Sequence, residues 1–224
     1  MKAAIAIMAK APEPGRAKTR LSPPLAADVA AELSRRFLLD TIERVRAVDG
    51  AVVAVFYTPP DSRALFEALA PGVALVPQAG DDLGDRLVAG FEHLLARGHR
   101  PVLFIGSDTP TLPLAVFHEA LARLAEPEVD VALGPTDDGG YYLIGLRQHH
   151  PALFASIPWS SERVAAETLR RARTAGLRVA VLPRWFDVDT AADLDRLAQS
   201  MEDEAEWETS HTARFLRGLK SGRQ

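Results

Sequence analysis

The sequence predicts a single α/β domain built on a doubly wound, mostly parallel sheet. Short apolar runs alternate with amphipathic stretches along the chain. Most of the runs are apolar at consecutive positions, which is typical of parallel strands covered on both faces. Regular alternation of strands and helices is typical of a doubly wound sheet. The predicted strands are residues 3–9, 51–57, 73–77, 102–106, 129–134, 141–146 and 177–182.

Apolar residues at helical spacing predict the helices that connect these strands. Two of the helices are followed by a glycine that stops them, Gly98 and Gly176. Ligands on such sheets bind outside the carboxyl ends of the strands, so we expect the functional residues in the loops that follow the strands. The predicted helices lie around residues 29–45, 83–94, 114–124, 162–175 and 193–197.

Composition and charge exclude several classes of protein. The 224 residues include no cysteine, which excludes a disulfide scaffold and a cysteine-ligated zinc or iron–sulfur site. The formal net charge of −4 argues against a dedicated nucleic-acid binder, which usually has a basic excess. No apolar run approaches roughly 20 residues, so we expect no membrane span, and residues 3–9 fit a buried strand better than a signal peptide. We therefore expect a cytoplasmic protein that contacts neither nucleic acid nor membrane.

The chain contains no internal repeat and no low-complexity linker. We expect one domain over residues 1–200, followed by a tail over residues 201–224 that ends in a short helix. The start of this tail, residues 201–210, carries five acidic side chains and no base. The sequence leaves the role of the tail and the oligomeric state open.

Basic residues gather in the loop that follows the first predicted strand. Residues 10–20 contain two of the four lysines of the chain and a single acidic residue, Glu13. The basic residues are Lys10, Arg16, Lys18 and Arg20. Lysine as a point charge and arginine as a two-pronged donor suit a polyphosphate at the end of a strand. A P-loop is excluded, because Gly15 is the only glycine before Lys18. The alternative is a solvated basic turn before a helix.

Two later loops carry carboxylates that could bind a hard metal ion. Asp108 follows the predicted strand 102–106, and Mg²⁺ often needs only one or two protein carboxylates beside phosphates. Asp187 and Asp189 are two residues apart, so in an extended segment both can face one cation. The alternatives are an Asx turn or a helix cap. The segment also resembles the D-x-D-x-T signature of phosphatases, but Thr190 directly follows Asp189, the signature belongs after the first strand of its domain, and too few residues follow Thr190 here.

Two more loops carry glycine beside polar residues. Gly139 and Gly140 follow Asp138, and adjacent glycines let a ligand approach backbone N–H groups closely. The Asp-Gly pair is also a signal for a hairpin turn, and that interpretation is slightly favoured. In residues 78–86, Gln78 and Arg86 could contact a base or a phosphate, or serve as ordinary loop residues. No Ser-His-Asp or Cys-His arrangement is found.

Six motifs in order resemble a known family over roughly residues 1–200. They are K-A-P-x-x-G-x-x-K-T-R-L at 10–21, Q-x-G-x-D-L-G-x-R at 78–86, G-S-D-x-P-x-L at 106–112, D-G-G-Y-Y-L-I-G at 138–145, I-P-W-S at 157–160 and D-V-D-T at 187–190. The chain resembles the DUF2064 group, also described as a glycosyltransferase family associated with radical-SAM and selenodomain clusters. That group lies in the glycosyltransferase-A, or nucleotide-diphospho-sugar transferase, superfamily.

The resemblance implies a role for each motif. Asp108, Asp187 and Asp189 would together hold Mg²⁺ or Mn²⁺, and Lys18, Arg20 and Asp108 would be catalytic. The nucleotide-binding residues would be Lys10, Gly15, Arg16, Lys18, Thr19, Arg20, Gln78 and Arg86. The residues bordering a pocket for a small-molecule acceptor would be Asp138, Gly139, Gly140, Tyr141, Trp159 and Ser160.

The reaction is a choice between related chemistries. The first loop has one glycine where sugar-nucleotide pyrophosphorylases have a glycine-rich loop, and Ser107-Asp108-Thr109 offers one carboxylate where many glycosyltransferases have D-x-D. The first loop is similar to that of guanylyltransferases that act on phospholactate or phosphoenolpyruvate in deazaflavin-cofactor synthesis. This similarity favours nucleotidyl transfer from a nucleoside triphosphate to a small phosphate- or carboxylate-bearing acceptor. The alternatives are glycosyl transfer from a nucleotide-sugar and a non-catalytic nucleotide-binding regulator.

Overall fold

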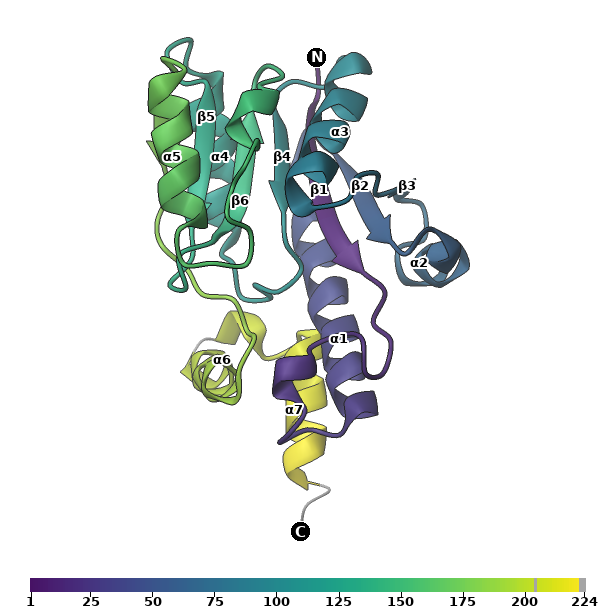
Figure 1. The fold of residues 1–224 in the computed structure, drawn as a ribbon. Coiled ribbons are helices and arrows are strands. Elements are labelled where there is room, and N and C mark those ends of the chain that lie inside the picture. The colour runs from purple at the N-terminus through teal and green to yellow at the C-terminus, as the bar shows by residue number, and fades with distance from the viewer. Residues whose placement is uncertain (204, 222–224) are drawn as a thin grey trace.

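One seven-stranded sheet organises the computed structural model, which describes residues 1–203 and 205–221 (Figure 1). The strand order is β3-β2-β1-β4-β6-β5-β7. All neighbouring strands are parallel except β6, which is antiparallel to both β4 and β5. The strands are β1 (Ala3–Lys10), β2 (Ala51–Thr58), β3 (Ala74–Pro77), β4 (Val102–Ile105), β5 (Val131–Pro135), β6 (Tyr141–Leu146) and β7 (Val179–Val181). The predicted fold class, a doubly wound and mostly parallel α/β sheet, is confirmed.

Helices cover both faces of the sheet, as the consecutive apolar positions of the strands require. Apolar side chains of α1, α2 and α4 pack on one face, and those of α3 and α5 pack on the other. The α-helices are α1 (Ala27–Arg46), α2 (Arg63–Leu69), α3 (Leu83–Ala96), α4 (Leu114–Ala125), α5 (Val164–Thr174), α6 (Ala191–Asp203) and α7 (His211–Ser221). The short 3₁₀ helices are η1 (Thr19–Leu21), η2 (Pro60–Ser62), η3 (Pro151–Leu153) and η4 (Ala205–Trp207).

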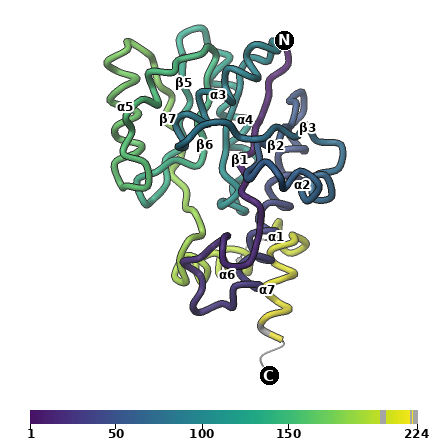
Figure 2. Tube along the Cα trace, turned by 45° about the vertical axis from the view of Figure 1, so that its right-hand side comes forward, coloured from purple at the N-terminus to yellow at the C-terminus, as the bar shows by residue number. Residues whose placement is uncertain are grey.

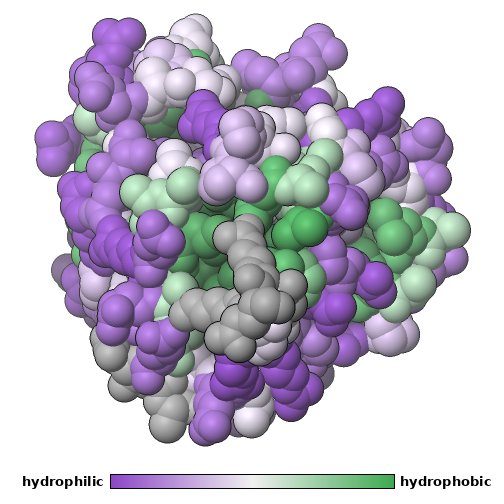
Figure 3. Space-filling model, turned by 90° about the horizontal axis from the view of Figure 1, so that it is seen from below, coloured by the Kyte–Doolittle hydropathy of each residue, from purple (hydrophilic) through white to green (hydrophobic). Residues whose placement is uncertain are grey.

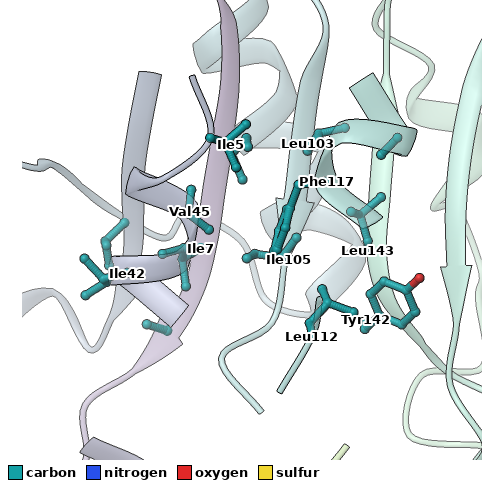
Figure 4. Packing of buried hydrophobic residues seen from close by; sticks show 14 of the residues in the cluster. Ile5, Ile7, Ile42, Val45, Leu103, Ile105, Leu112, Phe117, Tyr142 and Leu143 are labelled. Carbon is teal, nitrogen blue, oxygen red and sulfur yellow. The ribbon is translucent and has the colours of Figure 1, made fainter. Parts of the chain in front are cut away.

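The core is tightly packed between the central strands and α1 and α4 (Figure 4). Ile5 and Ile7 of β1 face Ile42 and Val45 of α1, and Phe117 of α4 lies against the β4 side of the sheet. All five side chains are at most 2 % exposed. Burying side chains of this size stabilises a fold by about 1.5–3 kcal/mol each, before the entropy cost of ordering them. The core therefore fixes β1 and β4 as the rigid centre of the sheet.

A third apolar cluster lies below the sheet and joins α1 and the segment before it to the C-terminal part of the chain (Figures 1 and 2). Leu21 and Leu25 of the first loop and Phe37 of α1 pack there with Val188 and with Trp207 near the C-terminus. The boundary predicted at residue 200 falls inside α6, and α7 lies against α1. Seen from below, this layer carries hydrophilic side chains around an apolar area near its middle (Figure 3). None of the described helices is both long and apolar enough to cross a membrane.

Candidate active site

The carboxyl ends of β1 and β4 lie side by side where the strand order reverses. β1 pairs with β2 on one side and with β4 on the other, both in parallel. The loops that follow β1 and β4 therefore begin next to each other, which is where ligands bind on sheets of this kind. A cleft of about 270 Å³ opens at this point. It is lined by Met8, Lys10, Arg16, Ala17, Lys18, Thr19, Arg20, Ser34, Ser107, Asp108 and Asp189.

The first loop is folded by its own backbone before it reaches the cleft. Ala11 continues the pairing of β1 by donating its N–H to the Thr58 carbonyl at 2.8 Å. The Glu13 carbonyl then accepts the N–H groups of Arg16 and Ala17, each at 3.1 Å, which closes a tight turn. Because Ala17 is buried, the turn is anchored to the protein and the polar residues around it face the cleft.

Four basic side chains of this loop line the cleft together, as expected. They are Lys10, Arg16, Lys18 and Arg20, and Thr19 lies among them. Arg16 forms an exposed ion pair with Glu13 at 3.0 Å. In the described part of the chain, no ion pair engages Lys10 or Arg20, so their charge is available to an anionic ligand. Gly15 does not line the cleft, and its positive φ of 72° shows that it serves the turn.

Lys18 has a different environment from the other three. Its side chain is 5 % exposed, and Nζ lies 2.8 Å from Asp108 Oδ1 and 2.9 Å from Asp189 Oδ1. Burial alone lowers the pKa of Lys18, but the carboxylates of Asp108 and Asp189 outweigh it and raise the pKa above its ordinary value. Lys18 is therefore a charged ammonium group held between two loops.

The segment after β7 brings Asp187 and Asp189 to the loop after β4. The Val188 N–H donates to the Asp108 carbonyl at 3.0 Å, which joins the two loops through their backbones. Thr190 and Asp193 cap the start of α6, since the Thr190 N–H donates to Asp193 Oδ2 at 2.8 Å and the Asp193 N–H donates to Thr190 Oγ1 at 3.3 Å. Asp189 is thus free of the capping role that was its alternative, and its carboxylate faces Lys18.

Negative charge is concentrated around Asp187. Burial, together with the carboxylates of Asp108, Asp138 and Asp189, raises the pKa of Asp187 to about 8, although Lys18 opposes the shift. An all-oxygen donor set with excess negative charge fits a hard divalent cation such as Mg²⁺. The three carboxylates predicted to bind metal therefore lie in one region, with the Lys18 ammonium between two of them.

A second group of side chains, away from the cleft, lies close enough together to bind a metal ion. Among the described residues, Asp40, Glu43 and His211 place ligand atoms within 4.8 Å of one another and could hold a metal ion. Both Asp40 oxygens already accept backbone N–H groups at the start of α7, from His211 at 2.7 Å and from Thr212 at 2.9 Å. Those contacts are those of a helix cap.

The Asp-Gly-Gly loop is a hairpin between β5 and β6, as the turn signal favoured. Asp138 Oδ1 accepts the Thr136 hydroxyl at 2.5 Å and the Gly140 N–H at 3.0 Å. Gly139 has a φ of 88°, and a methyl group on it would lie 2.0 Å from the Glu162 carbonyl oxygen. Only glycine fits this contact, which seats the hairpin on the segment before α5.

The other residues predicted for the acceptor lie around the I-P-W-S motif. Tyr141 and Trp159 pack edge to face with ring centroids 6.4 Å apart, and Ser160 is exposed. A methyl group on Gly84 would lie 3.0 Å from Trp159 Nε1, so the first turn of α3 touches this motif. These aromatic residues and the hairpin do not line the cleft of Lys18.

Gln78 and Arg86, predicted to bind nucleotide, do not line the cleft either. The Gln78 amide donates to the backbone carbonyls of Phe56 at 2.7 Å and Ala9 at 3.3 Å, which ties the ends of β1 and β2 together. Arg86, in the first turn of α3, donates to the carbonyl of Gly80 in the preceding loop at 3.1 Å. The contacts that the structure gives these two side chains are internal to the fold.

The cleft also includes polar residues that sequence reasoning missed. Ser34 comes from α1 and Ser107 from the loop after β4. Ser34 could have been found from the sequence, because it lies next to the buried positions Leu33 and Phe37 of an amphipathic helix. Ser107 lay next to Asp108 in a motif already singled out.

Comparisons with known proteins show the family and the fold of this chain. The family described as "Uncharacterized protein conserved in bacteria (DUF2064)" matches residues 41–161, which is more than half of the chain. The chain belongs to the DUF2064 family. Among curated protein sequences, none matches it.

Solved structures place this DUF2064 chain in the nucleotide-diphospho-sugar transferase fold. A protein from Desulfovibrio desulfuricans G20, provisionally described as a nucleotide-diphospho-sugar transferase, is 35% identical with a TM-score of 0.92, covering 99% of this chain and 96% of that one. A CMP:2-keto-3-deoxy-manno-octonic acid synthetase solved with CTP has a TM-score of 0.61 at 18% identity, covering 91% and 99%. A cytidylyltransferase from Leptospira borgpetersenii serovar Hardjo-bovis has 0.58 at 13% identity, covering 100% and 95%. At such identities the last two show the fold alone.

Proposed function

We propose that this protein transfers a nucleotidyl group from a nucleoside triphosphate to a small acceptor that carries a phosphate or a carboxylate. The observation that carries the proposal is one cleft lined both by Lys10 and Arg20, which form no ion pair with any described residue, and by the carboxylates of Asp108 and Asp189. Cations suit the phosphates and oxygen ligands suit a divalent metal, and nucleotidyl transfer needs both.

In this reaction an acceptor oxygen attacks the α-phosphorus, the bond to the bridging oxygen breaks, and pyrophosphate leaves with the electron pair. Lys10, Arg16 and Arg20 would bind the phosphates and position them in line with the acceptor. Lys18 and Arg20 would stabilise the charge that develops on the leaving pyrophosphate. A Mg²⁺ held by Asp108, Asp187 and Asp189 would supply neutralisation of phosphate charge when bound.

The fold of the relatives supports the same class of chemistry. The synthetase solved with CTP and the cytidylyltransferase handle nucleotides by their printed names. Glycosyl transfer from a nucleotide-sugar is the second candidate, because the relative at 35% identity is provisionally described as a nucleotide-diphospho-sugar transferase. The same cleft would then hold a diphosphate as the leaving group.

Calorimetric titration with each nucleoside triphosphate and with nucleotide-sugars, in Mg²⁺, tests the binding part. We expect a triphosphate to bind more tightly than any nucleotide-sugar, and Lys10→Ala to weaken it about tenfold. The matched control is Lys2→Ala, since Lys2 is exposed at the opposite end of β1. A preference for a nucleotide-sugar would favour glycosyl transfer instead.

Turnover tests the catalytic part. Asp108→Asn should lower release of pyrophosphate from the preferred triphosphate by roughly 10²–10³. Asp49→Asn, an exposed carboxylate after α1, serves as the control. Binding that is independent of Mg²⁺ and gives no turnover with any phosphate or carboxylate acceptor would support a regulator and contradict the proposal.

A further inference from the structure

Lys18 occupies the position that a metal ion would need. Its Nζ lies within 3 Å of one oxygen of Asp108 and one oxygen of Asp189. Asp108 comes from the loop after β4 and Asp189 from the segment after β7, and both line the cleft. A cation that binds these two oxygens directly would be in contact with the ammonium group, and like charges at that distance repel strongly.

The other cations of the loop do not share this conflict. Arg16 pairs with Glu13, and Lys10 and Arg20 are exposed with no ion pair in the described part of the chain. Of these four cations, only Lys18 is paired with the carboxylates of Asp108 and Asp189. Its backbone is also left-handed, with φ 49° and ψ 42°, a conformation that a non-glycine residue rarely adopts. The two ion pairs help to hold this conformation.

We infer that Lys18 is an internal counterion that stands in for the divalent metal, and that metal binding displaces its ammonium group from Asp108 and Asp189 toward the phosphates of the nucleotide. This inference rests on the proposed function. It deepens that function by coupling the two ligands: metal alone must expel Lys18, whereas metal with a triphosphate gives Lys18 new anionic partners. Metal and nucleotide therefore bind cooperatively.

Removing the lysine tests the inference, because it should strengthen metal binding rather than weaken it. Mn²⁺ is the probe, with free Mn²⁺ measured by electron paramagnetic resonance on the full chain without nucleotide. We expect Lys18→Met to bind Mn²⁺ on the order of tenfold more tightly than the wild type. The matched control is Lys10→Met, which removes the same charge from the same cleft without touching the carboxylates, and its Mn²⁺ affinity should stay near that of the wild type.

Three outcomes separate the possibilities. Unchanged or weaker Mn²⁺ binding by Lys18→Met, in a protein whose wild type binds Mn²⁺ with nucleotide, overturns the inference and leaves the proposed function standing. An equal gain in Lys10→Met also overturns it, since the effect would be one of general charge. Failure of the wild type to bind Mn²⁺ under any condition, with or without triphosphate, would overturn the metal site of the proposed function itself.

A measurement on the wild type covers the case in which Lys18→Met fails to fold. The chain has four lysines, so side-chain ¹⁵N labelling gives at most four ammonium signals. The ammonium of Lys18 is buried and paired with two carboxylates, so its protons should exchange slowly with water and its signal should be visible without metal. The signal that is missing from the spectrum of Lys18→Gln is that of Lys18. Saturation with Mg²⁺ and the preferred triphosphate should shift or broaden this signal. A signal that stays unchanged while both ligands bind would overturn the inference.

Discussion

The backbone N–H of Val188 donates to the carbonyl oxygen of Asp108 across 3.0 Å. Val188 is fully buried, so this bond joins the segment after β7 to the loop after β4 inside the protein. Asp187 and Asp189 flank Val188 and are thereby held beside Asp108 against the mutual repulsion of their charges. This backbone bond and the two ion pairs of Lys18 together assemble the carboxylate set.

Gly139→Ala should destabilise the protein and displace the hairpin between β5 and β6. A methyl group there would lie 2.0 Å from the Glu162 carbonyl, in addition to the cost of a positive φ. Gly176→Ala is the matched control, with a φ of +71° and nothing within 4 Å of its added methyl group. We expect the control to lose about 1–2 kcal/mol of unfolding free energy, which is the cost of placing alanine in the left-handed conformation.

Urea unfolding of the two glycine variants measures the difference. Gly139→Ala should lose at least about 1 kcal/mol more than Gly176→Ala, because overpacking adds to the backbone cost. Equal losses would mean that the hairpin yields without resistance, and that the contact with Glu162 does not hold it.

Glu13→Gln should tighten the binding of a triphosphate. Glu13 pairs with Arg16 in the first loop, and removing the carboxylate leaves the Arg16 charge to the ligand. Exposed ion pairs are worth about 0.2–1 kcal/mol, so we expect calorimetry to show a gain in affinity of about 1.4-fold to fivefold.

The matched control for Glu13→Gln is Glu126→Gln. Glu126 also pairs with an arginine three residues away, Arg123, at 2.8 Å and similar exposure, but outside the cleft. The Glu126→Gln variant should bind the triphosphate with the same affinity as the wild type. Equal gains in both variants would show an effect of net charge and would remove Arg16 from the binding site.

Asp187→Asn should change how stability depends on pH in metal-free buffer. The pKa of Asp187 is about 8 in the folded protein, above its ordinary value of 3.8, because of burial and the carboxylates around it. The folded state therefore holds a proton that the unfolded state has lost between about pH 4 and pH 8, so this residue's contribution to stability falls as the pH rises through that window.

Asparagine does not titrate, so Asp187→Asn does not lose this contribution to stability as the pH rises. The stability of Asp187→Asn relative to the wild type should rise by on the order of 2 kcal/mol between pH 5 and pH 8.5, a discounted figure for a side chain that is not fully buried. Denaturant unfolding in EDTA at several pH values measures it. A constant difference across the range would contradict the raised pKa.

Asp40→Ala should release the docking of α7 on α1. Asp40 is 5 % exposed and accepts the N–H groups of both His211 and Thr212. Loss of such a cap costs up to about 2 kcal/mol. Glu43→Ala on the same helix removes only the exposed contact with His211 and should cost less than about 1 kcal/mol. Equal losses in thermal unfolding would contradict the capping role.

Much of the fold was accessible from the sequence because its cause is local. Consecutive apolar positions predicted the buried strands, and the Asp-Gly pair at 138–139 favoured the hairpin that makes β6 antiparallel. The short helix α2 was missed, since seven residues give too little periodicity. The cation cluster of the first loop was accessible as well, because its members lie within eleven residues of sequence, 10–20.

Contacts between distant residues were not accessible. The pairing of Lys18 with Asp108 and Asp189 depends on the paths of three loops, which no local pattern encodes. The same holds for Gln78, whose amide turned to the backbone carbonyls of two strands rather than to the cleft. Chemistry at a strand end could be predicted from residue types, but the direction of a side chain could not.

A crystal structure with Mg²⁺ and a non-hydrolysable nucleoside triphosphate would show whether the cleft at the ends of β1 and β4 binds the nucleotide. We expect the phosphates to lie in the cleft against Lys10 and Arg20, with the metal bound by Asp108, Asp187 and Asp189. A nucleotide bound elsewhere on the sheet edge, with Lys10 and Arg20 left in solvent, would contradict it.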